Sequence, residues 1–248
     1  MQQPRVLHPQ PPSDAARDTA EGECIRLSQN RPLIRGRWLV GRKWITLRGS
    51  GQAILLIPPM TQRALFLDRD GVINRKPPEG QYVYRWSDFH LLPGAETAIA
   101  RLNRSGYKVI IVTNQRGVAL GLYTEQAILQ LHDQLRKHLA LYDAQIDSIY
   151  YCPHDKNECN CRKPGPGLFE QAFHDFPDAS IDNSIVIGDS LSDIEAGVRL
   201  SMPAIFIQGD PQHRKPGAEG AASLATAVAD SLLEAVDRYL PSMPIRER

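Results

Sequence analysis

Short apolar runs alternate with longer amphipathic segments along the chain from Arg63 onward. The apolar runs have the length of strands and lie at 64–67, 107–112, 146–151, 185–187 and 204–207. Between and after them, apolar residues recur with helical spacing at 95–104, 124–141, 167–176, 191–200 and 218–239. Short buried strands that alternate with amphipathic helices predict an α/β fold built on a doubly wound parallel sheet.

The first 60 residues have a different pattern. Residues 1–23 are rich in Pro, Gln, Asp and Ala, a composition typical of disorder. Residues 25–59 contain Arg and Lys but no acidic residue, and apolar stretches around Trp38 and Trp44 are interleaved with them. Such a segment can bind nucleic acid, but a solvated tail or a short hairpin is the simpler interpretation. We expect a disordered or accessory basic extension over 1–60 and a globular domain over 61–248.

The composition limits the partners and the cellular compartment that we expect. The 248 residues are 42% hydrophobic with a formal net charge of +1, which gives no global argument for nucleic acid or a membrane surface as a partner. We find neither an apolar run of the roughly 18 residues that a membrane helix needs nor the apolar centre of a secretory signal near the N-terminus. We therefore expect a cytoplasmic protein. Three of the four cysteines lie between 152 and 161, and in a reducing compartment such clustering favours metal binding.

Polar residues follow three of the predicted strands at the same end. Asp68 and Asp70 follow the first strand, Thr113 ends the second, and Asp189 follows the fourth. Ligands of doubly wound sheets bind beyond the carboxyl ends of the strands. We therefore expect these side chains to share one crevice.

The residue types in this crevice suit phosphoryl transfer. An unpaired carboxylate such as Asp68 can attack phosphorus, and a second one, Asp70, can protonate the leaving oxygen and then activate water. Two carboxylates beside a phosphate need a hard cation, and with Asp189 their oxygens suit Mg²⁺. Lys163 can neutralise a phosphoryl oxygen, while the Thr113 hydroxyl and the backbone amide that follows it can donate hydrogen bonds to others.

A second group of residues has the spacing of a metal site. Cys152, His154, Cys159 and Cys161 form the pattern C-x-H-x4-C-x-C. Three thiolates and one imidazole make a closed set of four ligands, which is typical of structural zinc; unrelated loop thiols or a redox pair are the alternatives. Because Lys163 follows two residues after Cys161, zinc here would hold the loop that presents this lysine.

Four motifs in order, LFLDRDGVIN, VTNQRG, CRKP and IGDSLSD, resemble those of the haloacid dehalogenase superfamily of phosphatases over residues 63–208. The resemblance implies that Asp68 is the nucleophile and Asp70 the general acid/base. It also implies that Mg²⁺ is held by the carboxylates of Asp68 and Asp189 and the backbone carbonyl of Asp70. It implies phosphoryl-binding roles for Thr113 and Lys163 and an orienting role for Asp193. We expect Arg69 to be a supporting or surface residue and assign it no catalytic role.

Within that superfamily, the stretch CPH…CNCRKPGPG resembles the D-glycero-D-manno-heptose 1,7-bisphosphate 7-phosphatases and the related histidinol-phosphate phosphatases. The resemblance to the heptose branch implies a domain without a cap, a small sugar-phosphate substrate and a place in carbohydrate metabolism, in lipopolysaccharide or nucleotide-heptose biosynthesis. We expect a monomer. By position, the resemblance implies substrate contacts for Glu79, Gly80, Gln81, Tyr82, Asn114, Gln115, Arg116 and Arg162.

The sequence departs from this branch on the sugar side of the site. Arg116 stands where a small residue is usual, Leu120 where an arginine is common, and the loop at 75–81 is longer. The alternatives are therefore a histidinol-phosphate phosphatase or another sugar-phosphate phosphatase, and further off a polynucleotide 3′-phosphatase that grips nucleic acid with its basic N-terminus. A non-enzymatic binding module is disfavoured, since Asp68, Asp70, Lys163 and Asp189 are all present.

Overall fold

The computed structural model describes residues 62–209 and 216–240, together with the backbone of four strands nearer the N-terminus. Those strands are β1 (Arg5–Leu7), β2 (Arg37–Val40), β3 (Lys43–Arg48) and β4 (Gln52–Leu56). The chain divides into two compact units, one of residues 10–61 and one of residues 1–9 with 62–248. In the smaller unit, β2, β3 and β4 form an antiparallel sheet. Apart from the four strands, the extension expected over 1–60 lies outside the described residues and stays a prediction.

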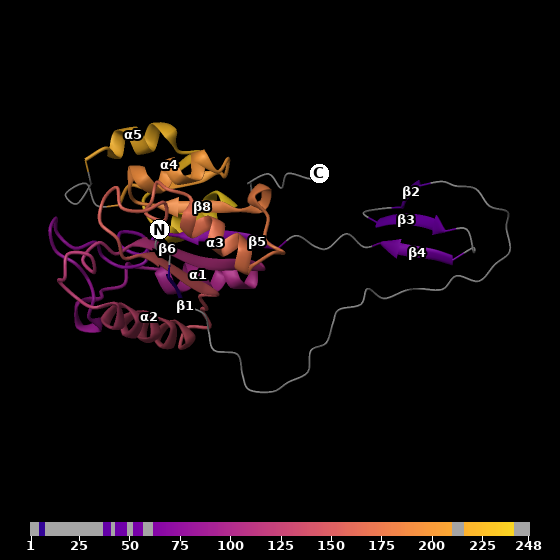
Figure 1. Cartoon of the computed structure of the whole chain (residues 1–248). Helices are drawn as coiled ribbons and strands as arrows, with labels where there is room; N and C mark the ends of the chain where they lie inside the picture. The colour runs from indigo at the N-terminus through magenta and orange to yellow at the C-terminus, as the bar shows by residue number, and fades with distance from the viewer. Residues whose placement is uncertain are drawn as a thin grey trace. The chain divides into compact units, whose positions relative to one another are not determined.

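The larger unit is built on one seven-stranded sheet (Figure 1). Its order is β1-β7-β6-β5-β8-β9-β10, in which only the edge strand β1 runs antiparallel to its neighbour. The six parallel strands confirm the predicted doubly wound α/β fold. They are β5 (Arg63–Leu67), β6 (Tyr107–Asn114), β7 (Ser148–Cys152), β8 (Ile185–Gly188), β9 (Ala204–Ile207) and β10 (Ala227–Ala229).

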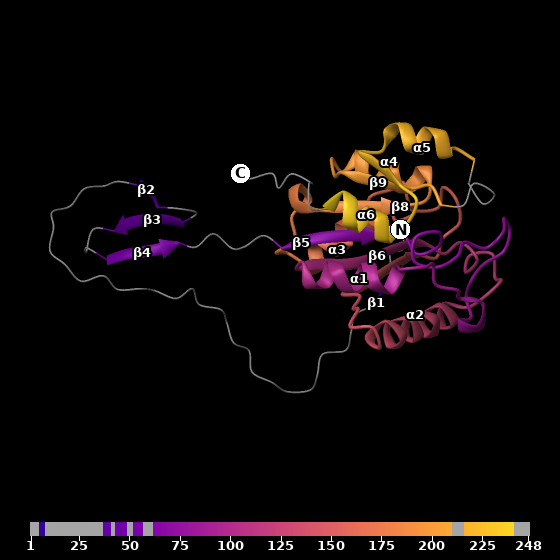
Figure 2. The ribbon, with the colours of Figure 1, turned by 180° about the vertical axis from the view of Figure 1, so that it is seen from behind.

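Alternate residues of the central strand β5 enter two separate cores, because successive strand side chains point to opposite faces. Leu65 and Leu67 belong to the core covered by α1 (Ala95–Arg104), α2 (Glu125–Ala140) and α6 (Leu232–Arg238), the last seen best in Figure 2. Ala64 and Phe66 belong to the core covered by α3 (Gly167–Asp175), α4 (Leu191–Arg199) and α5 (Ala218–Leu224). These two layers hold the strand ends rigidly at one edge of the sheet.

The helix expected over 218–239 is wrong, since the segment forms α5, then β10, then α6. The backbone amide of Thr226 donates to the Ala204 carbonyl at 2.8 Å, and Ala204 returns a hydrogen bond to the Thr226 hydroxyl at 3.1 Å. Ser231 then caps α6 by accepting from the Glu234 amide at 3.2 Å. Pairing with the open edge of β9 and these side-chain hydrogen bonds outweigh a continuous helix, because Ser and Thr favour caps and turns.

The connection between β5 and α1, residues 68–94, lies over the carboxyl ends of the strands. Its regular helix is the short 3₁₀ turn η1 (Trp86–Asp88); a second such turn, η2 (Ile181–Asn183), precedes β8. Isolated bridges pair Asn74 with Asp70 and with Leu91, which folds this connection back on itself. Within the described residues this connection carries no inserted domain, and no helix is long and apolar enough to cross a bilayer.

Candidate active site

Lys163 joins two carboxylates, that of Asp68 directly after β5 and that of Asp193 in the first turn of α4. Its ammonium lies 3.0 Å from Oδ1 of Asp68 and 2.5 Å from Oδ1 of Asp193, and it donates to the Val112 carbonyl at 2.6 Å. All three charged residues are buried. Burial by itself would lower the pKa of Lys163, but the charges of Asp193 and Asp68 outweigh it and raise that pKa above its ordinary value. Lys163 is therefore a fixed positive charge beside Asp68.

Asn114 fixes the backbone of this lysine. Its side-chain amide donates to the Lys163 carbonyl at 3.2 Å and accepts from the Lys163 amide at 3.0 Å. Asn114 is the last residue of β6, so the loop that carries Lys163 is tied directly to the sheet. Asn114 therefore has a structural role, in positioning the Lys163 backbone, in addition to the substrate contact predicted for it.

Three carboxylates gather where a cation could bind. Asp68, Asp189 and Asp193 each offer an oxygen, and these atoms lie within 4.8 Å of one another. Oδ1 of Asp193 pairs with Lys163, while its Oδ2 accepts from the Ser190 amide at 3.0 Å and the Ser190 hydroxyl at 2.5 Å, at the start of α4. Both carboxylate oxygens of Asp193 are therefore engaged within the chain, which fits the orienting role predicted for it. Hard oxygen donors of this kind fit Mg²⁺.

Gly71 makes room for this group. It has a φ of +96°, and a Cβ at this position would lie 2.2 Å from Oδ2 of Asp189. The glycine of the motif DRDG therefore allows both the turn after β5 and the close approach of the two loops.

Asp70 is held by three side chains that the sequence did not assign together. Arg69 donates from Nη2 to both carboxylate oxygens, at 3.0 and 2.9 Å. Asn74 donates to Oδ1 at 2.9 Å, and Gln115 to Oδ2 at 3.3 Å. Arg69 is fully buried. A residue expected to have a minor supporting role thus orients the predicted general acid/base.

The rest of the Arg69 guanidinium ties two further elements to the site. Nη2 also donates to the Val83 carbonyl at 2.8 Å, and Nη1 lies 3.3 Å from Nε2 of His132 on α2. Because arginine only donates hydrogen bonds, Nε2 of His132 is the acceptor. Burial, and then the charge of Arg69, hold the pKa of His132 well below its ordinary value. His132 is therefore a neutral, buried side chain that accepts a hydrogen bond from Arg69.

Gln115 connects the predicted phosphoryl-binding hydroxyl to the general acid/base. Its Nε2 lies 3.1 Å from the Thr113 hydroxyl as well as 3.3 Å from Asp70, and its Oε1 accepts from the Tyr123 hydroxyl at 2.8 Å. Gln115 is only 2% exposed. Gln115 is therefore a buried link between Thr113 and Asp70.

The remaining residues expected on the sugar side lie in two places. Arg116 forms a bidentate pair with Asp155, whose pKa the Arg116 hydrogen bond lowers to about 2. Arg162 lies close enough to Asp155 to lower that pKa further, and its Nη1 is buried without a hydrogen-bond partner among the described residues. Tyr82 is half-buried against the Tyr123 ring, with centroids 5.8 Å apart. Glu79, Gly80 and Gln81 are exposed.

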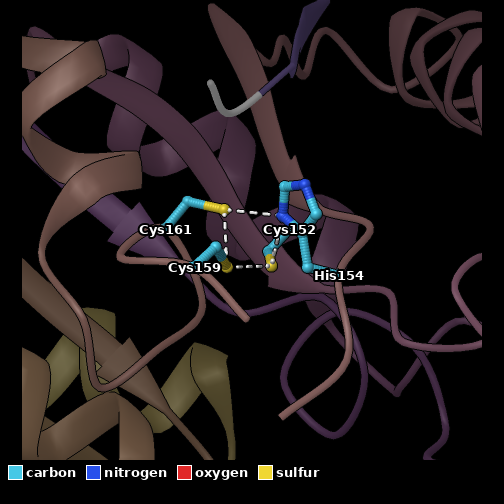
Figure 3. A group of neighbouring side chains, drawn as sticks. All are labelled: Cys152, His154, Cys159 and Cys161. Carbon is cyan, nitrogen blue, oxygen red and sulfur yellow. Dashed lines mark hydrogen bonds between the residues drawn. The ribbon is translucent and has the colours of Figure 1, made fainter. Parts of the chain in front are cut away.

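The predicted metal ligands of the second group converge (Figure 3). Sγ of Cys159 lies 3.5 Å from Sγ of Cys152 and 3.2 Å from Sγ of Cys161. Nδ1 of His154 lies 3.2 Å from Sγ of Cys161 and 3.7 Å from Sγ of Cys152. Tetrahedral zinc with bonds of about 2.3 Å to sulfur separates its ligand atoms by about 3.8 Å. The four atoms thus have nearly the spacing that a single ion requires.

Two further observations concern this cluster. A hydrogen bond from Cys161 lowers the pKa of the Cys152 thiol to about 5, and the same interaction raises the pKa of Cys161. Cys152 ends β7, and Cys161 stands immediately before Arg162 and Lys163. A metal ion here would therefore join the sheet to the loop that carries the buried lysine.

One residue at the site was not identified from the sequence. The ammonium of Lys76, in the lengthened loop after β5, lies 2.5 Å from Oδ2 of Asp189. Lys76 lies two residues beyond the motif LFLDRDGVIN and directly before two prolines, a position that gives no periodic or motif signal.

Comparison with known proteins agrees with this geometry. A HAD-hydrolase-like family model, where HAD denotes haloacid dehalogenase, matches residues 160–235. The D-glycero-alpha-D-manno-heptose-1,7-bisphosphate 7-phosphatase of Mycobacterium bovis is 40% identical over 174 residues, which are 70% of this chain and 89% of the relative. The D-glycero-beta-D-manno-heptose-1,7-bisphosphate 7-phosphatase of Vibrio cholerae is 37% identical over 189 residues, 73% and 97% of the two chains.

A solved structure shares the fold. The D,D-heptose 1,7-bisphosphate phosphatase of B. bronchiseptica, complexed with magnesium and phosphate, superimposes with a TM-score of 0.63 at 27% identity. The match covers 73% of this chain and 99% of that one. Together with the ordered motifs and the buried cluster around Asp68, these similarities show that the chain belongs to the HAD-like hydrolases, among the relatives of the D-glycero-D-manno-heptose 1,7-bisphosphate 7-phosphatases.

Proposed function

We propose that the protein removes the 7-phosphate of D-glycero-D-manno-heptose 1,7-bisphosphate. The observation that carries this proposal is the carboxylate of Asp68, held 3.0 Å from the ammonium of Lys163 and within 4.8 Å of the other two carboxylates of the cluster. A carboxylate with a fixed countercharge beside a cation site suits nucleophilic attack on a phosphate ester. The names of the relatives supply the sugar.

In the first step, an oxygen of Asp68 attacks phosphorus and the bond from phosphorus to the sugar oxygen breaks. Asp70 gives its proton to that leaving oxygen, and an aspartyl-phosphate remains on Asp68. In the second step, Asp70 takes a proton from water, the water attacks phosphorus, and inorganic phosphate leaves Asp68. The hydrogen bonds from Arg69, Asn74 and Gln115 keep the carboxylate of Asp70 in place for both transfers.

The remaining residues of the site stabilise charge. Lys163 and the Thr113 hydroxyl would contact phosphoryl oxygens, which gain negative charge as the sugar leaves. Asp68, Asp189 and the Asp70 carbonyl would hold Mg²⁺, which supplies positive charge to the phosphoryl group when bound. The close carboxylate oxygens of Asp68 and Asp189 support this assignment.

We infer that the Cys152, His154, Cys159 and Cys161 cluster binds a structural zinc ion. Four protein ligands close the tetrahedral coordination, so such an ion orders the loop and takes no direct part in hydrolysis. Thiol ligands also suit the reducing cytoplasm, where we place the protein. We propose that it acts as a monomer, because the groups assigned to hydrolysis all come from one chain.

The arginines on the sugar side of the site support a bisphosphate substrate of either anomer. Arg116 pairs with Asp155 and Arg162 lies near the same carboxylate, so a guanidinium in this region could bind a second phosphate. The relatives act, by name, on both the alpha and the beta anomer. Glu79, Gly80, Gln81 and Tyr82 remain our proposal for the loop that contacts the sugar.

A substrate panel tests this function. Phosphate release would be measured with both anomers of the heptose bisphosphate, histidinol phosphate and an oligonucleotide 3′-phosphate, each with and without Mg²⁺. We expect kcat/KM to be highest for one heptose anomer, and Asp68→Asn to lower kcat by at least about a thousandfold. Efficient hydrolysis of only histidinol phosphate would refute the substrate, and substantial turnover by Asp68→Asn would refute the nucleophile.

A further inference from the structure

Lys76 places a positive charge directly on a carboxylate assigned to the metal. Its Nζ lies 2.5 Å from Oδ2 of Asp189, and the two side chains are only 16% and 8% exposed. The backbone immediately before this lysine is anchored: the Arg75 amide donates to the His90 carbonyl at 2.7 Å, and the Arg75 carbonyl accepts from the Asn74 side chain at 2.9 Å. The ammonium is therefore delivered to Asp189 by a fixed part of the loop.

The charges of the site explain why a second lysine matters. Asp68, Asp189 and Asp193 carry three negative charges within a small volume. Lys163 already lies between Asp68 and Asp193. The ammonium of Lys76 lies on the third carboxylate, where it supplies positive charge from the chain itself.

Mg²⁺ and the Lys76 ammonium cannot both occupy the same position on Oδ2 of Asp189. An ion that binds Asp189 displaces the ammonium from Oδ2 or shares the carboxylate with a second positive charge, and either costs free energy and weakens metal binding. When a phosphate is also present, its oxygens offer the displaced ammonium a new negative partner. A lysine can make this change, because its ammonium is a point charge on a flexible stem.

We propose that Lys76 is a positioning residue that couples metal and phosphate binding: it holds Asp189 while the ion is absent and moves to a phosphoryl oxygen when both ion and phosphate are bound. This inference rests on the proposed metal-binding role of Asp189. The coupling makes each ligand favour the other, since a linkage between two binding sites is reciprocal. The site then acquires its full positive charge mainly when a phosphate is there to receive it.

Calorimetric titration of the full-length, zinc-loaded protein with Mg²⁺, with and without inorganic phosphate, tests this coupling. Without phosphate, we expect Lys76→Met to bind Mg²⁺ at least about fivefold more tightly than the wild type. In the wild type, phosphate should strengthen Mg²⁺ binding by on the order of tenfold, and most of that enhancement should disappear in Lys76→Met.

Two variants serve as controls. Lys76→Arg keeps the positive charge that opposes the ion, and phosphate should still strengthen its Mg²⁺ binding. Lys137→Met removes a lysine from α2 that pairs with Asp133 and is 75% exposed, and it should leave both titrations unchanged. Lys76→Gln repeats the test if Lys76→Met lacks the wild-type circular dichroism spectrum.

Unchanged or weaker Mg²⁺ binding in a folded Lys76→Met or Lys76→Gln variant would overturn the inference. Asp189→Asn separates this outcome from a failure of the proposed function. If Asp189→Asn binds Mg²⁺ as the wild type does, the metal assignment itself is wrong. If Asp189→Asn loses binding while the Lys76 variants do not change it, only the role of Lys76 is rejected.

Discussion

Asn114 and Lys163 hold each other through two reciprocal hydrogen bonds, at 3.2 and 3.0 Å, between a side-chain amide and a backbone peptide group. This pair joins β6 to the loop whose ammonium contacts Asp68. It fixes the lysine at its backbone, while Asp68 and Asp193 fix it at its charged end. The position of the countercharge is therefore set from both ends of one side chain.

Replacing Asn114 tests the value of this clamp. We expect Asn114→Ala to lower kcat by about tenfold to a hundredfold, because small displacements of a charge-stabilising group weaken it strongly in the transition state. Asn103 is a matched control, since its amide makes the same kind of reciprocal pair with the Gln145 backbone, at 3.1 and 2.8 Å, away from the site. Asn103→Ala should cost about 1 kcal/mol of stability with kcat unchanged. Equal effects of both variants on kcat, measured by phosphate release, would contradict a specific role for Asn114.

Glycine substitutions separate backbone strain from crowding of the metal site. Gly71→Ala places a Cβ 2.2 Å from Oδ2 of Asp189, whereas Gly106 has a similar φ of +78° and open space around it. Both variants should lose about 1 kcal/mol of stability, since alanine is strained at positive φ. Only Gly71→Ala should raise the Mg²⁺ concentration for half-maximal activity, by at least about tenfold. Equal Mg²⁺ requirements in the two variants would show that Asp189 tolerates the displacement.

Stability should depend on pH through His132. Burial holds the pKa of His132 in the folded protein well below its unfolded value near 6.5. Neutral His132 therefore contributes fully to stability above pH 6.5, and this contribution is lost as the pH falls below 6.5. The free energy of unfolding should then decrease by up to about 1.4 kcal/mol per pH unit below pH 6.5. Urea unfolding from pH 5 to 8 measures this slope.

Two histidine variants identify the source of that slope. His132→Gln keeps an acceptor for Arg69 and should flatten the pH dependence. His174→Gln changes a histidine whose side chain is 83% exposed and should leave the slope as in the wild type. A slope that persists in His132→Gln would assign the dependence to other groups.

The proposed zinc ion can be removed by changing one ligand. We expect Cys161→Ser to reduce the zinc content from about one ion per chain to none, and to lower both the melting temperature and kcat. The loss of kcat follows because Lys163 lies two residues beyond Cys161. Cys24→Ser changes the one cysteine outside the cluster and should retain metal and activity. Full activity of a zinc-free Cys161→Ser protein would show that the cluster is not needed to position Lys163.

The sequence alone predicted those site residues that stand as polar groups directly after an apolar strand. Asp68, Thr113 and Asp189 stand out because polar groups follow apolar runs, and the parallel sheet brings them together as expected. The family and fold predictions are confirmed by the comparisons and the topology. The catalytic and substrate-binding roles of the individual residues stay predictions, which the variants above test.

The residues missed from the sequence act through long-range contacts. Arg69 looks like an ordinary charged residue between two aspartates. Its burial is made favourable by the Asp70 carboxylate together with the distant Val83 carbonyl and His132. Lys76 meets Asp189 across 113 positions of sequence. The break within 218–239 likewise depends on the open edge of β9, which is formed elsewhere in the chain. Such partners are set by tertiary structure and leave no local periodicity.

If the thiol cluster binds zinc as proposed, the hydrolytic site would depend on redox conditions. Hydrolysis of a phosphate ester transfers no electrons, yet the proposed zinc loop that presents Lys163 is held by three sulfur atoms, of which Cys159 is partly exposed. Thiolates that coordinate zinc can be oxidised, and oxidation releases the ion. Peroxide would then inactivate the enzyme with loss of zinc while Asp68 and Asp70 remain chemically intact.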